Sequence, residues 1–174
     1  MKVICPSDDI QTKWAIKEAA EQDGPVYIRL CRLATPKIYE EKQKFSFGKG
    51  IQFGEGTVAT VFATGAMVSE ALIAQEKLKN EGIDIRVVDI HTIKPIDEKL
   101  IIKCAKETNK LISIEDHSII GGLGTAISDV LIEKYPKKLV KIGVKDVFGK
   151  SGKATELLEH FGLTSKAIIK EVKK

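Results

Sequence analysis

The stretch Glu115–Gly124, EDHSIIGGLG, holds the residue types best suited to chemistry in this sequence of 174 residues. Two acids and a histidine could transfer protons, and glycines before a helix would let a phosphate approach the helix N-terminus. Neighbouring loop positions rarely converge on one point, however, and no Ser or Cys in a nucleophile elbow accompanies them. The stretch therefore indicates either an anion site or a tight passage from a strand into a helix.

Two further sets of polar residues follow expected strands. Asp89 and His91 come at the carboxyl end of an apolar strand, where open α/β sheets place their ligands. Pro95 follows closely, so a histidine held within its loop is the simpler interpretation. Thr64-Gly65 could turn around a phosphate or simply connect a strand to a helix. The sequence contains neither GxGxxG nor GxxxxGK[ST], which argues against a dinucleotide-binding site and against a P-loop.

Arg29 and Arg32 belong to a predicted strand, Val26–Arg32, that contains no acidic residue. Strand alternation places these arginines on opposite faces. Arg32, at the carboxyl end, is the better placed to hold a phosphate through two parallel hydrogen bonds. An ion pair with acids of the following segment would explain the same residues, and both interpretations stand at this point.

The pattern of the chain predicts how these residues are positioned. From Thr57 onward, β-branched runs of strand length alternate with helical segments, which is typical of βαβ units. The strands are continuously apolar, as in a sheet covered on both faces. We therefore expect an α/β fold, a doubly wound and mostly parallel sheet, over residues 57–174. Residues 1–35 predict one strand–helix–strand piece, too small to bury a sheet alone, and residues 36–56 predict a linker.

Composition limits the possible functions. The formal net charge of +4 arises from dispersed lysines, which argues against a nucleic-acid partner. Three widely spaced cysteines without CxxC spacing favour a reducing, cytoplasmic location and argue against a zinc site. No apolar run approaches the roughly 20 residues that span a bilayer, so no membrane partner is expected.

Several motifs, taken in order, resemble the carboxyl-terminal part of transketolases. They are TIKPID, the GGLG turn that follows Glu115 and His117, and FGKSG with the later ELL and GLT. The resemblance covers essentially the whole chain. It implies that residues 1–35 finish a pyrimidine-binding domain and that residues 57–174 form the transketolase carboxyl-terminal domain. Deoxyxylulose-5-phosphate synthases and the β-subunits of 2-oxo acid dehydrogenases are similar to this family.

The resemblance implies an enzyme of the pentose phosphate pathway that uses thiamine diphosphate and Mg²⁺ to move a two-carbon ketol unit between sugar phosphates. It places no catalytic, cofactor-binding or metal-binding residue in this chain. One position carries over: Arg32 matches the arginine that binds the substrate phosphate. No role carries over to Glu115 or His117.

The expected partners are an amino-terminal transketolase part or subunit, further copies through the carboxyl-terminal domain, and sugar phosphates. The chain alone is expected to be inactive, contributing assembly and one phosphate contact. The alternatives are a docking module like a dehydrogenase β-subunit, a deoxyxylulose-5-phosphate synthase fragment, and a free-standing nucleotide-binding domain.

Overall fold

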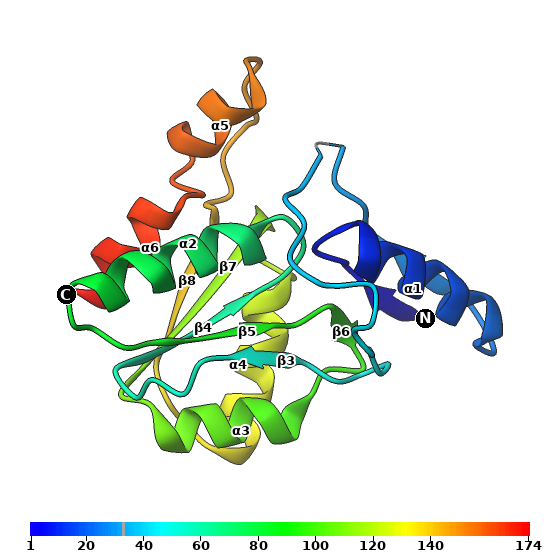
Figure 1. The fold of residues 1–174 in the computed structure, drawn as a ribbon, viewed down its shortest axis with the longest axis horizontal. Helices are drawn as coiled ribbons and strands as arrows, with labels where there is room; N and C mark the ends of the chain where they lie inside the picture. The colour runs from blue at the N-terminus through cyan, green and yellow to red at the C-terminus, as the bar shows by residue number, and fades with distance from the viewer. Residues whose placement is uncertain (33) are drawn as a thin grey trace.

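The computed structural model describes residues 1–32 and 34–174. Leu33, which falls within the predicted piece 1–35, lies outside the described residues. The central element is a five-stranded sheet in the order β3-β5-β4-β7-β8 (Figure 1). Its strands are β3 (Ile51–Phe53), β4 (Ala59–Ala63), β5 (Arg86–Asp89), β7 (Lys110–Ser118) and β8 (Leu139–Val144). All neighbours are parallel except β3, which pairs antiparallel with β5, so the expected mostly parallel α/β sheet is confirmed.

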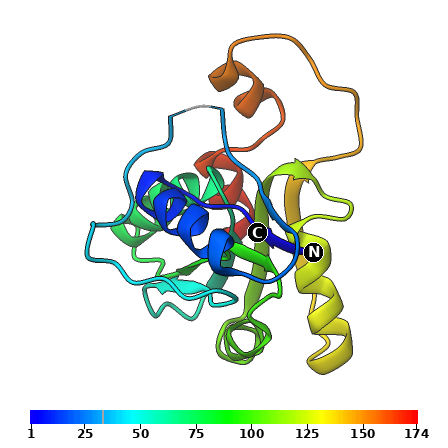
Figure 2. The ribbon, with the colours of Figure 1, turned by 90° about the vertical axis from the view of Figure 1, so that its right-hand side faces the viewer.

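Helices cover both faces of this sheet (Figures 1 and 2). One apolar cluster joins the sheet to α2 (Met67–Asn80) and α6 (Ser165–Val172), and another joins it to α3 (Glu98–Glu107) and α4 (Leu123–Lys134). Neighbouring residues of β4 serve opposite clusters, because Val61 lies in the first and Phe62 in the second, both fully buried. This double burial explains why the strands are continuously apolar in sequence.

The amino-terminal unit forms a second, three-stranded sheet beside the first. It contains β1 (Lys2–Ile4), α1 (Asp9–Glu21) and β2 (Val26–Ile28), with the order β2-β1-β6. Strand β6 (Thr92–Lys94) comes from the TIKPID segment and pairs antiparallel with β1. The sheet of the amino-terminal unit is thus completed by a strand from the later part of the chain.

Strand β2 is shorter than the predicted Val26–Arg32. Its parallel pairing with β1 ends at Ile28, and one further bond joins the Arg29 amide to the Ile4 carbonyl at 2.8 Å. Beyond Arg29 the described residues leave the strand. Arg32 lies in a bend, not in the strand that the sequence predicted.

The predicted linker 36–56 packs against the sheet and contributes β3 to its edge. Gln75 of α2 holds this edge by donating from Nε2 to the carbonyls of Phe53 at 2.9 Å and Ile85 at 2.8 Å. Tyr39 of the same segment is buried. The domain boundaries at 35 and 57 stay predictions, but the segment between them is built into the fold.

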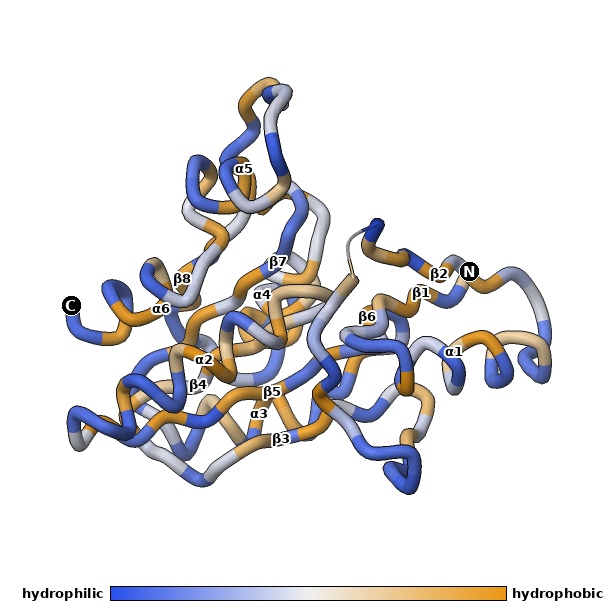
Figure 3. The backbone as a smooth tube through the Cα atoms, turned by 45° about the horizontal axis from the view of Figure 1, so that its top comes forward, coloured by the Kyte–Doolittle hydropathy of each residue, from blue (hydrophilic) through white to orange (hydrophobic). Residues whose placement is uncertain are grey.

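An arm projects from the body of the molecule between β8 and α6 (Figure 2). It consists of residues 145–153, which form no helix or strand and are all exposed, followed by α5 (Ala154–His160). Residues 145–153 include two exposed apolar residues, Val147 and Phe148, the second of which is 98% exposed, and Figure 3 shows hydrophobic colour along the arm. Within residues 1–32 and 34–174, no helix is both long and apolar enough to cross a membrane.

Candidate functional site

The glycine-rich turn is a helix cap whose anion is supplied by the protein itself. Strand β7 carries Glu115, and the Glu115 carboxylate accepts hydrogen bonds from the amides of Leu123 at 2.7 Å and Gly124 at 2.9 Å. These amides belong to the first turn of α4, where free N–H groups and the helix dipole favour a negative charge. The carboxylate therefore occupies the place that an external phosphate would take. Of the two interpretations of this stretch, the strand-to-helix passage is confirmed.

Gly122 is required by this arrangement. A Cβ atom on Gly122 would lie 1.9 Å from Glu115 Oε2, far inside van der Waals contact. Only glycine leaves room for the buried carboxylate beneath the start of the helix.

Asp116, the next residue, pairs with Arg29 across a sequence separation of 87 residues. One guanidinium nitrogen of Arg29 donates to Asp116 Oδ1 at 2.7 Å, and the other donates to the Asp116 main-chain oxygen at 3.0 Å. The side chains are 30% and 17% exposed, so the pair is largely shielded from water. The acid that neutralises Arg29 is thus contributed by β7, not by its own strand or by the following segment.

The Arg32 side chain has no polar partner among the other described side chains. It is exposed, and among the described residues it forms no ion pair and no side-chain hydrogen bond. The alternative interpretation, an ion pair with acids of the following segment, is not seen within this part of the chain. The assignment of Arg32 to a substrate phosphate stays a prediction.

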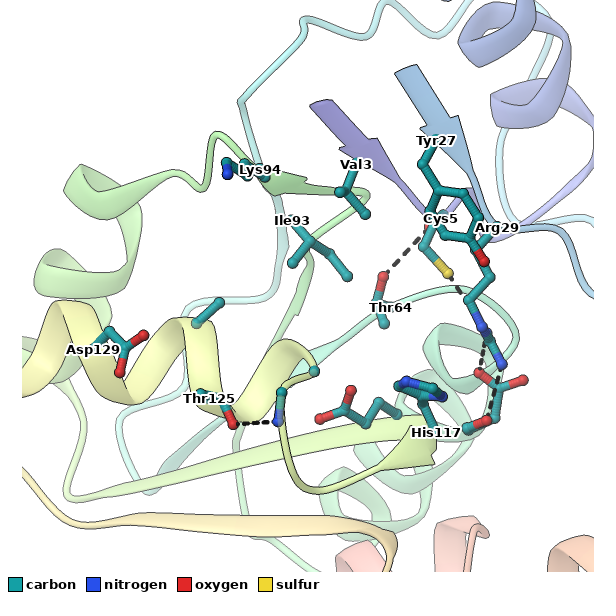
Figure 4. Close-up of a pocket in the computed structure, with 15 residues that line it drawn as sticks. Val3, Cys5, Tyr27, Arg29, Thr64, Ile93, Lys94, His117, Thr125 and Asp129 are labelled. Atoms are coloured by element: carbon teal, nitrogen blue, oxygen red, sulfur yellow. Dashed lines mark hydrogen bonds and ion pairs between the residues drawn. The ribbon is translucent and has the colours of Figure 1, made fainter. Parts of the chain in front are cut away.

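A cavity of about 440 Å³ lies between the amino-terminal unit and the carboxyl ends of β4 and β7 (Figure 4). Arg29 and His117 border it, and so does Thr64, whose hydroxyl donates to the Ile90 carbonyl at 2.8 Å. A Cβ atom on Gly65 would approach Cys5 Sγ to 2.8 Å, so the Thr64-Gly65 turn is shaped by packing against the amino-terminal unit. The Thr64 hydroxyl and the carbonyls of Thr64 and Gly65 are bonded within the chain, which favours the plain strand-to-helix connection.

Asp89 is fully buried and joins three parts of the chain. Its Oδ2 accepts hydrogen bonds from Tyr39 at 2.7 Å, from Gln11 at 2.9 Å and from Ser7 at 3.2 Å. Burial raises the pKa of Asp89 to about 6, although the three donors oppose the shift. Through these three bonds the buried carboxylate holds the amino-terminal unit and the 36–56 segment to β5.

His91 is also a packed residue. Its Nδ1 lies 2.9 Å from the Thr92 hydroxyl, and its ring meets Trp14 edge to face at a centroid distance of 4.9 Å. Burial lowers the pKa of His91 to about 4, so the ring is neutral at physiological pH. The interpretation as a loop histidine fits, although Nε2 is buried without a partner among the described residues.

The residues brought together by the fold were only partly visible in the sequence. Asp116 stood out within its motif, and Arg29 within its strand, but nothing in the pattern linked them. Tyr39 and Gln11 gave no signal as partners of Asp89. In the described ranges, no group of three or more His, Cys, Asp or Glu residues is placed to hold a metal ion.

Comparison with known proteins identifies the family. The family model described as the transketolase C-terminal domain matches residues 48–168. A Methanocaldococcus jannaschii protein named as a transketolase C-terminal section is 46% identical over 175 residues, covering 99% of this chain and 54% of that protein. A 6-deoxy-6-sulfo-D-fructose transketolase subunit of Clostridium sp. strain MSTE9 is 42% identical, covering 98% of this chain and 53% of the relative.

The solved structures agree. A split-gene transketolase, described as an inactive β4 tetramer, superposes with a TM-score of 0.92 at 42% identity, covering 99% of this chain and 56% of that one. The Campylobacter jejuni transketolase, at 20% identity and a TM-score of 0.74, shares the fold. The chain spans about half the length of the first curated relatives it matches. It belongs to the transketolase family, of which it forms a carboxyl-terminal section.

Proposed function

We propose that this chain is part of a thiamine-diphosphate-dependent transketolase that moves a two-carbon ketol unit between sugar phosphates. The observation that carries the proposal is similarity along essentially the whole chain to proteins named as transketolases and transketolase subunits. One of these relatives is named for apulose-4-phosphate, a phosphorylated sugar. A docking module of a 2-oxo acid dehydrogenase and a deoxyxylulose-5-phosphate synthase fragment are not favoured, because the relatives reported above are all transketolases.

The cofactor belongs to other parts of the complete enzyme in this proposal. The described residues offer no cluster of acidic or imidazole ligands for Mg²⁺, and the amides at the start of α4 already bind Glu115. The described residues therefore do not fit Mg²⁺ or the diphosphate, and no reaction step is assigned to these residues.

Arg32 is the proposed substrate contact within this chain. A guanidinium can hold a phosphate through two parallel hydrogen bonds, with more geometric specificity than an ammonium group. Binding energy gained at the phosphate, remote from the reacting carbons, would orient the sugar for reaction. The exposure of Arg32 and its lack of an ion pair among the described residues support this role.

Substitution of Arg32 in the assembled enzyme tests the proposal. Arg32→Ala is expected to raise KM for a phosphorylated ketose by about tenfold or more, since charge-assisted hydrogen bonds contribute roughly 1.5–3 kcal/mol. KM for an unphosphorylated ketose should stay within about twofold. Lys37→Ala, which removes a charge from an exposed position nearby, is the matched control and should alter neither value. Equal losses for both substrates would contradict the assignment.

The proposed partners are an amino-terminal transketolase subunit or part, and further copies of the same section, all in the cytoplasm. A relative named as a subunit and a structural neighbour described as an inactive β4 tetramer support this arrangement. The chain should show no ketol transfer alone and gain activity on co-expression with an amino-terminal transketolase part. Size-exclusion chromatography with light scattering would report the assembly.

A further inference from the structure

Arg32 lies on a loop whose two ends are held by neighbouring parts of the amino-terminal unit. The first end is Arg29, whose amide donates to the Ile4 carbonyl of β1 at 2.8 Å. The second end is held by Asp8, which follows Ile4 by four positions, so the main chain between the two anchors spans at most about 14 Å. The described residues between the ends of the loop form no helix or strand.

Asp8 holds the second end through a buried carboxylate that is shared between the loop and a helix. Its Oδ2 accepts hydrogen bonds from the amides of Ile38 at 2.9 Å and Tyr39 at 2.8 Å. Its Oδ1 accepts a hydrogen bond from the amide of Gln11 at 2.8 Å and so caps α1. Hydrogen bonds to a carboxylate are roughly twice as strong as bonds between neutral groups, and Asp8 is 2% exposed.

The loop also lies against the start of α1 on both sides of Arg32. A hollow there is lined by Cys31 before Arg32, by Ala34 after it, and by Asp8. The anchor and the residues that flank Arg32 therefore share one surface, while Arg32 itself is exposed.

We propose that Asp8 is a positioning residue for the substrate phosphate, because it closes the loop that presents Arg32. This inference rests on the proposed function of Arg32. A loop held at both ends lets the guanidinium search a smaller volume than a loop held at Arg29 alone. Less conformational entropy is then lost when a phosphate binds, and such pre-organisation raises affinity. In this role Asp8 acts through the loop and leaves the reacting carbons unaffected.

The variant Asp8→Asn separates the loop anchor from the helix cap. Asparagine caps a helix about as well as aspartate, so its side-chain oxygen can keep the bond to the Gln11 amide. Its NH₂ group then faces the amides of Ile38 and Tyr39, and these donors have lost their acceptor. The Tyr39 hydroxyl keeps its bond to Asp89 at 2.7 Å, so the segment that follows the loop stays on the sheet.

A double-mutant cycle in the assembled enzyme tests this inference, with D-fructose 6-phosphate and D-fructose as matched donors. Asp8→Asn is expected to raise KM for the phosphorylated donor by on the order of threefold to tenfold, within the range of coupling between residues that act together. Its kcat for that donor and its kcat/KM for D-fructose should be unchanged. In an Arg32→Ala background, Asp8→Asn should have no further effect on either donor.

Asp9→Asn is the matched control. Asp9 borders the same hollow, and its only ion pair among the described residues is an exposed one with Lys13 at 3.3 Å. The control removes the same charge one residue away and should leave both donors unaffected. If Asp8→Asn fails to fold, Asp8→Ser takes its place, because serine also caps a helix but has no second oxygen for the loop.

Limited proteolysis of this chain measures the loop itself. Trypsin cleaves after arginine and lysine, and Arg32 and Lys37 both lie between the two anchors. Because a loosened loop is cut more readily, Asp8→Asn should be cleaved faster at these two positions than either the parent chain or Asp9→Asn.

The possible results separate the two proposals. If Arg32→Ala is selective for the phosphorylated donor but Asp8→Asn is not, or if their effects simply add, the positioning role is overturned and the Arg32 contact stands. Equal cleavage of Asp8→Asn and Asp9→Asn also overturns the positioning role. If Arg32→Ala itself shows no selectivity, the contact fails and the positioning role fails with it. Selective, non-additive effects together with faster cleavage support both.

Discussion

At the scale of single residues, the Glu115 carboxylate shows how this chain resolves a buried charge. Glu115 lies beneath the start of α4 and is 2% exposed, yet two amides of the helix bind its carboxylate. A buried charge is tolerated when hydrogen bonds and an opposite dipole compensate it. The same carboxylate leaves no room for a side chain at residue 122. Glu115 and Gly122, which in the sequence suggested an anion site, are therefore two parts of one helix cap.

Gly122→Ala should destabilise the chain by about 2–4 kcal/mol, because the added methyl group displaces the buried carboxylate from its donors. Gly149→Ala is the control, since a Cβ atom there would have no neighbour within 4 Å and the φ angle is not positive. Urea unfolding should show a change below about 0.5 kcal/mol for the control. Similar values for both variants would contradict the steric explanation.

The pKa of Asp89 predicts a pH-dependent stability. Because the pKa rises from 3.8 to about 6 on folding, the folded state binds this proton more tightly than the unfolded state does. The associated stability is present below about pH 4 and is lost as the pH rises through 6. Asp89→Asn does not ionise, so its stability relative to the parent chain should improve by roughly 2–3 kcal/mol between pH 4 and pH 7.

Urea unfolding of both proteins at several pH values measures this difference. The lowered pKa of His91 acts with the opposite sign, since its stability contribution is present above pH 6.5 and is lost as the pH falls toward 4. His91 is common to both proteins, so its effect cancels in the comparison. A difference that stays constant with pH would show that Asp89 keeps its ordinary pKa.

At the scale of elements, α6 is a short helix that completes a core. The helix is eight residues long and packs on α2, and its Ile168 is fully buried in the apolar cluster that α6 shares with α2 and the sheet. An isolated helix of this length is unstable in water, so α6 depends on that apolar contact.

Ile168→Ala should therefore cost about 2–5 kcal/mol of unfolding free energy, as buried large-to-small substitutions do. Ile132→Ala on α4 is the control, because Ile132 is 73% exposed and should contribute almost nothing. Thermal unfolding followed by circular dichroism compares the two variants. A small loss for Ile168→Ala would mean that α6 is not part of the cooperative core.

The elements also show what can be predicted from the sequence. The four parallel strands and their helices were predictable because each is long enough to display its apolar pattern. Strands β3 and β6 were missed because each has three residues and lies in a segment without alternation. The contacts of Arg29 with Asp116, and of Tyr39 with Asp89, join residues 87 and 50 positions apart. Such contacts follow from strand order and register, which exist only in the folded chain.

At the scale of the whole molecule, the two sheets exchange strands across the predicted domain boundaries. Strand β6 follows three strands of the larger sheet in sequence but pairs with β1, while β3 lies in the predicted linker and pairs with β5. A cut at the predicted boundary, residue 57, would remove β3 and expose the edge of β5. Unpaired sheet edges promote association between chains.

A chain beginning at residue 57 should consequently aggregate more and unfold at a lower temperature than one beginning at residue 48, where the family match starts. Both chains lack β1, so they differ only in the segment that contains β3. Light scattering and thermal unfolding make the comparison. Equal aggregation and equal unfolding temperatures would place the domain boundary at residue 57, as the sequence pattern predicted.

The strand exchange has a consequence for fragment complementation. A break in the exposed residues 40–44 would leave β1, Arg29 and Tyr39 in one fragment, and β6, Asp116 and Asp89 in the other. Every one of these partners would then have to be recovered by binding between two molecules. The shorter fragment has no core of its own and should fold only when it binds the longer one. Non-covalent binding of the two fragments would then restore the fold without the peptide bond between them.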